Sequence, residues 1–295
     1  MKNIIVKGVI TALITPMTEN GIDYAAFKRI LKKQIETKVA AIVLFGTTGE
    51  PLSLLPEEKT KLYYTAREIV GNKIPVFCGV SSPVTYFAAK SAECLSKLGA
   101  DGLLVVTPYY YSCNRSGIFL HYKRISEITD LPIIVYNVPA RTGVDLTKDS
   151  ELINEISKIS NVCAIKNAAK TGESNIEFLH STKMPVYCGN DSFNLDSLKN
   201  GSYGSISVIS NLFPEIEAAM HSNYFSNKNV EEYDKILQNV CKSFTGIPNP
   251  IAIKYACSLR YGFEANYRLP LTPPTAEQQR RINNITVETL KNMEK

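Results

Sequence analysis

The chain has no tryptophan, only three histidines and no long hydrophobic run. Its apolar stretches, such as residues 39–45, fall far short of the roughly 20 residues that a membrane-spanning helix needs. The early stretch at residues 9–14 is interrupted by Thr11 and lacks a small-residue cleavage pattern, which argues against a secretory signal. We therefore expect no membrane span and a cytoplasmic location. The histidines show no paired spacing, so we expect no metal site.

The chain also lacks a strong excess of one charge. Lys and Arg number 33 against 28 Asp and Glu, which gives a net charge of +5. A balance this mild predicts no nucleic-acid partner and is compatible with small anionic substrates. The seven cysteines are widely spaced and form no C-x-x-C pair, so we expect buried free thiols rather than disulfides.

The chain does contain a regular series of short strand-like runs. Its 295 residues, 44% of them hydrophobic and 21% charged, are typical of a globular protein near the size of one TIM barrel with an appendage. Eight apolar, β-branched runs bounded by turn residues lie at residues 8–14, 41–45, 75–79, 102–106, 132–136, 162–166, 185–188 and 203–208.

Segments with helical periodicity separate these runs. In the first segment, Phe27, Ile30 and Ile35 share one face while lysines and arginines cover the other. Nearly continuous apolar strands that alternate with helices indicate a parallel sheet covered on both faces. Eight such units favour a closed (β/α)8 TIM barrel, with a doubly wound open sheet as the structural alternative.

The C-terminal part contains no further strand-like run. From about Asn211 onward it has the pattern of helices, broken at residues 246–250 and again at residues 269–274. Thr275 and Gln278 have the spacing of a capping box, which predicts the start of the last helix. We expect a barrel domain at residues 1–224 and a C-terminal helical domain at residues 225–295.

Polar and reactive residues follow four of the predicted strands, where a TIM barrel builds its active site. These segments are Gly46-Thr47-Thr48-Gly49-Glu50 after the second run, Thr107-Pro108-Tyr109-Tyr110-Tyr111 after the fourth, residues 136–143 at the end of the fifth, and Lys166-Asn167 at the end of the sixth. We expect their side chains to meet at one mouth of the barrel.

Lys166 ends an apolar strand, so its amine is expected in partly dry surroundings that disfavour the ammonium form. A neutral amine condenses with a keto group to a Schiff base, whose positive nitrogen acidifies the neighbouring carbon. Tyr136 is placed to transfer the protons of this chemistry, with the hydroxyl groups of Tyr110 and Thr47 as a relay. The alternatives are a solvated lysine and packed tyrosine rings.

Two further features suit the binding of anions. The glycines that flank Thr47 and Thr48 allow a sharp turn whose N–H groups can bind a carboxylate. Arg141, in the turn after Tyr136, offers a planar fork for a second carboxylate, although an isolated loop arginine is commonly solvated.

These motifs, in this order, resemble the pyruvate-dependent class I aldolases related to N-acetylneuraminate lyase, and within them the dihydrodipicolinate synthase family. The resemblance spans nearly the whole chain. It also includes residues 12–16, Gly189-Asn190-Asp191, Ile206-Ser207-Val208, Asn249-Pro250-Ile251 and Arg268-Leu269-Pro270.

The resemblance implies an enzyme that condenses pyruvate with aspartate semialdehyde to 4-hydroxy-tetrahydrodipicolinate, in the diaminopimelate route to lysine, without metal or organic cofactor. Lys166 is implied as the Schiff-base residue, Tyr136 as proton donor and acceptor, and Thr47 as the link in its relay. Tyr110 is implied as a third member, supplied to the neighbouring subunit across a tight dimer. Two such dimers are implied to form a homotetramer.

The resemblance also implies how the substrates bind. Thr47 and Thr48 are implied to hold the pyruvate carboxylate, and Arg141 the carboxylate of the semialdehyde. Gly189 and Ile206 are implied to line the pyruvate pocket.

The chain departs from the family pattern at several positions. Asn167-Ala168-Ala169-Lys170 stands where the synthases usually have Glu-Ala-Ser or Glu-Ala-Thr followed by Gly, and Tyr111 stands where many have Asn. We expect these positions to bear on the second substrate. They keep open a lyase for sialic acid or a 2-keto-3-deoxy sugar acid, and a non-catalytic paralogue that binds a keto acid.

Regulation is a further point of departure. Lysine-inhibited members carry small polar, His, Asn and Glu residues in a dimer cleft. The corresponding residues here are Pro51, Leu52, Pro56, Lys59, Pro83 and Phe87. We therefore predict that lysine does not inhibit this chain.

Overall fold

The computed structural model describes residues 5–293 and contains a closed barrel of eight parallel strands. The strands are β1 (Gly8–Ala12), β4 (Ala41–Leu44), β5 (Val76–Val80), β6 (Gly102–Val106), β7 (Ile133–Asn137), β8 (Val162–Asn167), β9 (Val186–Cys188) and β10 (Gly204–Ser207). Because β1 pairs with both β4 and β10, the sheet has no free edge. The predicted TIM barrel is confirmed, and the open-sheet alternative is wrong.

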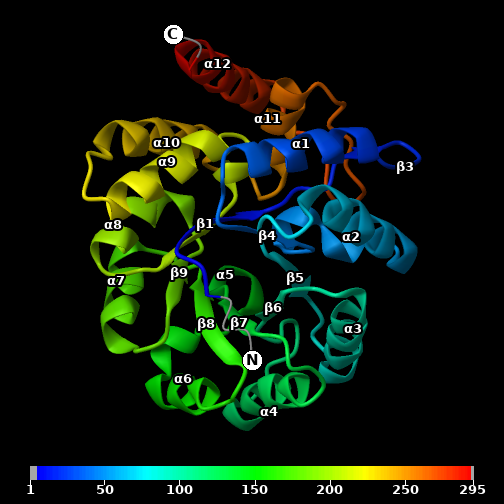
Figure 1. The fold of residues 1–295 in the computed structure, drawn as a ribbon, viewed down its shortest axis with the longest axis vertical. Helices are drawn as coiled ribbons and strands as arrows, with labels where there is room; N and C mark the ends of the chain where they lie inside the picture. The colour runs from blue at the N-terminus through cyan, green and yellow to red at the C-terminus, as the bar shows by residue number, and fades with distance from the viewer. Residues whose placement is uncertain (1–4, 294–295) are drawn as a thin grey trace.

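Helices surround the ring of strands (Figure 1). They are α1 (Tyr24–Glu36), α2 (Pro56–Val70), α3 (Thr85–Leu98), α4 (Arg115–Ser126), α5 (Pro139–Thr142), α6 (Ser150–Ser157), α7 (Gly172–Ser181), α8 (Asn194–Lys199) and α9 (Pro214–Phe225). Short 3-10 helices form at η1 (Thr47–Gly49), η2 (Pro51–Ser53), η3 (Leu146–Lys148), η4 (Asp191–Phe193) and η5 (Ile209–Asn211).

The first helix shows how the sequence specifies this arrangement. Asp23 accepts a hydrogen bond from the N–H of Ala26 and so caps the amino end of α1. Phe27, Ile30 and Leu31 are buried between the helix and the strands, as the periodicity predicts. A separate apolar cluster, which includes Val43, Leu104, Ile134 and Ala164, fills the barrel interior.

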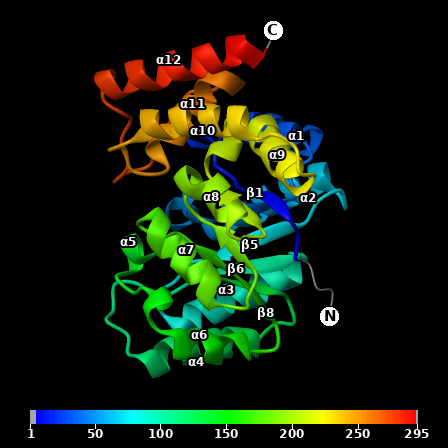
Figure 2. The same ribbon diagram turned by 90° about the vertical axis from the view of Figure 1, so that its left-hand side faces the viewer.

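Three more helices, α10 (Glu231–Phe244), α11 (Ile251–Tyr261) and α12 (Ala276–Met293), form layers on one side of the barrel (Figure 2). The predicted capping box precedes α12, because the N–H of Thr275 donates to Gln278 Oε1 at 2.9 Å and the N–H of Gln278 donates to Thr275 Oγ1 at 3.3 Å. The break before α12 begins earlier than predicted, because α11 ends at Gly262 in the left-handed conformation.

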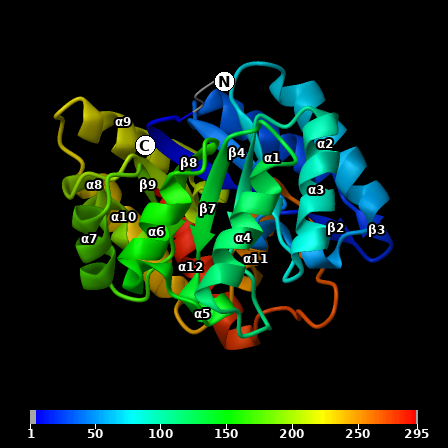
Figure 3. The same ribbon diagram turned by 90° about the horizontal axis from the view of Figure 1, so that it is seen from below.

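Seen from below, α4 and α6 lie in front of the barrel and α12 lies behind it (Figure 3). The eighth barrel helix, α9, ends at Phe225, next to the predicted domain boundary. Whether the two parts are separate domains stays a prediction. No helix within residues 5–293 combines the length and the apolar character needed to cross a membrane.

Two details differ from expectation. Strands β2 (Met17–Thr18) and β3 (Gly21–Ile22) form a small antiparallel hairpin that the sequence did not reveal, because two-residue strands carry no usable periodicity. All seven cysteines are free thiols, but only Cys78, Cys188 and Cys257 are fully buried, and Cys94 is exposed on α3.

Candidate active site

The carboxyl ends of β7 and β8 bring Tyr136 and Lys166 together. The two residues are register partners in adjacent parallel strands, so their side chains point to the same face of the sheet, into the barrel. The Nζ atom of Lys166 lies 4.4 Å from the centre of the Tyr136 ring. Lys166 is 4% exposed and Tyr136 is 7% exposed, so the amine and the phenol meet in a nearly closed environment.

Gly189, directly after β9, leaves the space that the lysine needs. A Cβ atom at this position would lie 2.9 Å from Cε of Lys166 and 3.0 Å from the carbonyl oxygen of Asn167. Any other residue would therefore displace the Lys166 side chain. The predicted Gly189 is thus adjacent to the lysine amine.

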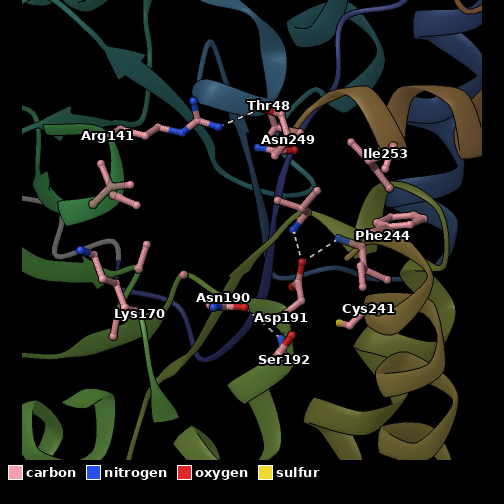
Figure 4. Close-up of a pocket in the computed structure, with 18 of the residues that line it drawn as sticks. Thr48, Arg141, Lys170, Asn190, Asp191, Ser192, Cys241, Phe244, Asn249 and Ile253 are labelled. Atoms are coloured by element: carbon pink, nitrogen blue, oxygen red, sulfur yellow. Dashed lines mark hydrogen bonds between the residues drawn. The ribbon is translucent and has the colours of Figure 1, made fainter. Parts of the chain in front are cut away.

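The site contains a cavity of about 450 Å³, and Figure 4 shows residues that line it. Tyr136, Lys166, Gly189, Thr48 and Arg141 all line it, as expected for residues at one mouth. Its opposite wall comes from the C-terminal helices and the loop between them, namely from Cys241, Phe244, Thr245, Ile247, Asn249, Ala252 and Ile253. Apart from Asn249, which belongs to an Asn-Pro motif, these residues carry no local pattern that would place them in the site.

Thr47 and Thr48 form the turn after β4. The N–H groups of Gly49 and Glu50 donate to the carbonyl oxygens of Gly46 and Thr47. The N–H groups of Thr47 and Thr48 have no acceptor among residues 5–293. Two free N–H groups in one tight turn can bind a carboxylate oxygen.

Asn249 links this turn to Arg141. Its Nδ2 donates to Thr48 Oγ1 at 3.2 Å, and its carbonyl oxygen accepts a hydrogen bond from Nη2 of Arg141 at 2.9 Å. Figure 4 shows Arg141 reaching across the pocket toward Asn249 and Thr48. The exposed guanidinium group is thus held at the rim of the cavity and faces solvent.

The remaining predicted catalytic residues, Thr47 and Tyr110, are not among the residues that line the cavity of Lys166. Thr47 lines a second cavity of about 410 Å³, which shares Val138, Arg141 and Asn249 with the first. Tyr110 lines neither cavity. It is 89% exposed, has a φ of 72°, and its ring meets the ring of Tyr111 edge-on.

Two residues lie outside the lining of the cavity. Ile206 is fully buried in the apolar cluster that also contains Tyr136, and its place beside bound pyruvate stays a prediction. The cavity lining after β10 comes from Val208 and Ile209.

Asn167 also lies outside the cavity, because consecutive strand residues point to opposite faces. It is fully buried and accepts a hydrogen bond from Asn137 Nδ2 at 2.9 Å. It donates in turn to Asn175 Oδ1 at 3.0 Å. Asn167 itself does not line the cavity, whereas Ala168, Ala169 and Lys170 do. That this segment bears on the second substrate stays a prediction.

No histidine within residues 5–293 lines this cavity. Burial lowers the pKa of His121 and of His221 to about 4, and each contacts a hydroxyl group, Thr85 and Ser205 respectively. Neither residue lines the cavity. Within residues 5–293, no three His, Cys, Asp or Glu side chains are grouped as metal ligands.

Comparison with known proteins agrees with this geometry. Residues 5–289 match the model of the dihydrodipicolinate synthetase family. The chain is 36% identical to the 4-hydroxy-tetrahydrodipicolinate synthase of Campylobacter jejuni, with 96% of each chain covered, and 38% identical to that of Rickettsia bellii, with 96% of this chain and 97% of the relative covered.

Solved structures give the same result. The crystal structure of dihydrodipicolinate synthase from Thermotoga maritima superposes with a TM-score of 0.92 at 36% identity and covers 96% of this chain and 98% of its own. A family match over nearly the full length, joined to the same fold, settles the relationship. The chain belongs to the dihydrodipicolinate synthetase family.

Proposed function

We propose that this enzyme condenses pyruvate with aspartate semialdehyde to 4-hydroxy-tetrahydrodipicolinate through a Schiff base on Lys166. The observation that carries the proposal is the buried amine of Lys166 against the ring of Tyr136 at the base of a cavity. The relatives named 4-hydroxy-tetrahydrodipicolinate synthase support the choice of substrates.

The chemistry begins when Nζ of Lys166 attacks the keto carbon of pyruvate and water leaves. The positive nitrogen of the resulting Schiff base allows the methyl carbon to lose a proton, which gives an enamine. This carbon attacks the aldehyde carbon of the second substrate, and the new alkoxide takes up a proton. The amino group of that substrate then attacks the Schiff-base carbon, which closes the ring and releases Lys166. Tyr136 moves the protons in these steps.

The substrate carboxylates are assigned to two separate groups. The free N–H groups of Thr47 and Thr48 hold the carboxylate of pyruvate. Arg141, at the cavity rim, holds the carboxylate of the semialdehyde through charge-assisted hydrogen bonds. Gly189 keeps the path to the lysine open.

Borohydride reduction in the presence of pyruvate tests the proposal. The wild-type protein should gain a stable carboxyethyl group on Lys166, located by peptide mass mapping, and Lys166→Ala should gain none. Lys170→Ala is the matched control, because this second lysine also lines the cavity but is exposed. An adduct that persists in Lys166→Ala, or none in the wild type, contradicts the proposal. Release of pyruvate from sialic acid, without condensation activity, would favour a lyase instead.

We propose further that Tyr110 acts in the site of a neighbouring subunit, in a tight dimer that pairs into a tetramer. Its 89% exposure and its absence from the lining of its own cavity support this. Other exposed apolar residues follow β4, β5 and β6 in the same part of the barrel and suit an interface, namely Leu52, Tyr86, Phe87 and Tyr111.

The cytoplasmic location stays a proposal that cell fractionation tests.

Subunit complementation tests the shared residue. A mixed dimer of Lys166→Ala and Tyr110→Phe subunits keeps one complete site only if Tyr110 crosses to its neighbour. Mixing the two inactive variants should then restore activity, to at most half that of the wild type. If each subunit uses its own Tyr110, no site in the mixed dimer is complete and activity stays absent. Light scattering of the purified protein gives the subunit number.

A further inference from the structure

The most deeply buried ion pair that lies near the site joins Glu50 to Lys254. Glu50 immediately follows the turn of Thr47–Gly49, and Lys254 lies on α11. The side chains are 2% and 0% exposed, and Nζ of Lys254 contacts a carboxylate oxygen of Glu50. The same amine donates to the carbonyl oxygen of Asn266 at 3.1 Å. Helix α11 thus contacts Glu50, the residue that follows the turn proposed to bind pyruvate.

Stability alone does not explain this pair. Burial raises the pKa of Glu50 and lowers that of Lys254, so each charged form depends on its partner. Burying an ion pair costs so much solvation that apolar residues of similar volume often serve a fold as well or better. The role of the Glu50–Lys254 pair must therefore be sought in the segment that the pair holds in place.

The turn that it holds is conformationally strained. Phe45 and Glu50, at its two ends, have φ values of 59° and 54°, a region that costs a residue with a side chain about 1–2 kcal/mol. Gly79 packs so tightly against it that a Cβ atom there would lie 2.1 Å from the carbonyl oxygen of Phe45. Thr15 Oγ1 donates to the carbonyl oxygen of Gly49 at 2.8 Å. Such a turn persists only when its surroundings fix it.

We propose that Glu50 and Lys254 form a positioning pair, which sets the direction of the free N–H groups of Thr47 and Thr48 for the carboxylate of pyruvate. This inference rests on the proposed function. Neither residue of the pair touches the substrate. Lys254 holds Glu50, Glu50 fixes the end of the turn, and the turn presents its N–H groups to the cavity. Helix α11 is thereby a working part of the active site.

The pair should affect the two substrates unequally. The turn is assigned to pyruvate. Arg141 is held by the backbone carbonyl oxygen of Asn249, whereas Asn249 contacts the turn through its side-chain amide, at Thr48 Oγ1. Loss of the pair should therefore raise the KM for pyruvate and leave the KM for the semialdehyde nearly unchanged. A general loss of structure would change both.

Lys254→Met is the main test variant, and Arg260→Met is its matched control. Arg260 also lies on α11 and forms an ion pair, with Glu215 on α9, away from the turn. We expect Lys254→Met to raise the KM for pyruvate, and the pyruvate concentration for half-maximal borohydride trapping, roughly 10-fold or more, because small displacements of binding groups carry penalties of this size. Arg260→Met should lower the thermal midpoint, because it breaks a partly buried pair, but leave both values within about 2-fold of wild type, because that pair lies away from the turn.

A double variant covers the case in which Lys254→Met does not fold. Glu50→Gln combined with Lys254→Met removes both buried charges together, which folds tolerate better than one unpaired charge. It should show the same selective rise for pyruvate. Lys254→Arg, which keeps a cation opposite Glu50, should recover part of the affinity. If the folded variants match Arg260→Met in their KM for pyruvate, the pair is merely structural and the inference is wrong. Trapping of pyruvate by the wild type, measured first, separates this outcome from failure of the Schiff-base proposal.

Discussion

The two faces of the β7–β8 pair carry neighbouring residues with opposite environments. On the inner face, Tyr136 and Lys166 meet at the base of the cavity. On the outer face, the next residues in each strand, Asn137 and Asn167, join each other by a hydrogen bond between the strands and the helices. In each strand, the residue proposed to act in catalysis is thus followed directly by a residue that bonds the strand to its surroundings.

Hydrogen bonding distinguishes the two faces. The outer amides form a continuous chain in which Asn137 donates to Asn167, Asn167 to Asn175, and Asn175 to Ser197. On the inner face, neither the Tyr136 hydroxyl nor the Lys166 amine has a hydrogen-bond partner within residues 5–293. A group whose bonds are all made is stable and inert, whereas an unpaired amine and phenol remain free to react with a substrate. The contrast separates stability from activity and can be tested.

The largest expected effect is that of Tyr136→Phe. Without its hydroxyl the inner face loses the proposed proton carrier, so kcat should fall by roughly 10²–10⁴-fold, the usual range for a general acid–base group. The thermal midpoint should remain near that of the wild type, because the ring stays and no buried hydrogen bond is lost. Steady-state kinetics and a melting curve on the same preparation measure both. A variant with undiminished turnover would remove Tyr136 from the mechanism.

Asn167→Ala should produce the reverse pattern. It leaves one N–H of Asn137 and the Oδ1 of Asn175 without partners in a fully buried region, at a cost of roughly 2–4 kcal/mol in the free energy of unfolding. Borohydride trapping of pyruvate should still label Lys166, since the lysine side chain points to the other face. Denaturant unfolding gives the stability. A loss of trapping in a folded Asn167→Ala protein would show that the two faces are not independent.

The reactive residues of the inner face could be predicted from the sequence, because apolar runs locate the strand ends and few residue types perform Schiff-base chemistry. Lys166 and Tyr136 were found on this basis. The period-two alternation of a strand also predicts that Asn167 faces away from the side of the sheet that carries Lys166. The comparison with the family pattern concerned only its missing carboxylate. The pattern described the residue type and not the direction of the side chain.

The other parts of the site depend on contacts between distant segments. Phe244, Asn249 and Ile253 reach the cavity only because α10 and α11 lie near the carboxyl ends of the strands. The pairing of Glu50 with Lys254 has no local signal either, since neither residue type is rare and their separation follows no period. The packing of helices over the mouth of a barrel depends on contacts throughout the structure. Local sequence spacing therefore does not predict that these residues belong to the site.

Arg141→Ala should have a smaller effect, confined to the second substrate. The loss of charge-assisted hydrogen bonds to one carboxylate should raise the KM for aspartate semialdehyde roughly 10- to 100-fold. Pyruvate trapping on Lys166 should be nearly unchanged, because Arg141 lines the cavity as an exposed residue whereas Lys166 lines it as a buried one. Kinetics with each substrate varied in turn measure the two constants. An unchanged KM for the semialdehyde would assign that carboxylate to another group.

The smallest expected effect is that of lysine itself, which we predict to be none. An inhibitory site for lysine must satisfy an ammonium group and a carboxylate, yet five of the six corresponding residues here are apolar, namely Pro51, Leu52, Pro56, Pro83 and Phe87. The sixth, Lys59, would repel the ligand's ammonium groups whenever it is charged. Turnover measured at saturating substrates with millimolar lysine should equal that without it. Inhibition under these conditions would mean that lysine binds at other residues, and competition with pyruvate would then show whether the inner face of the β7–β8 pair is among them.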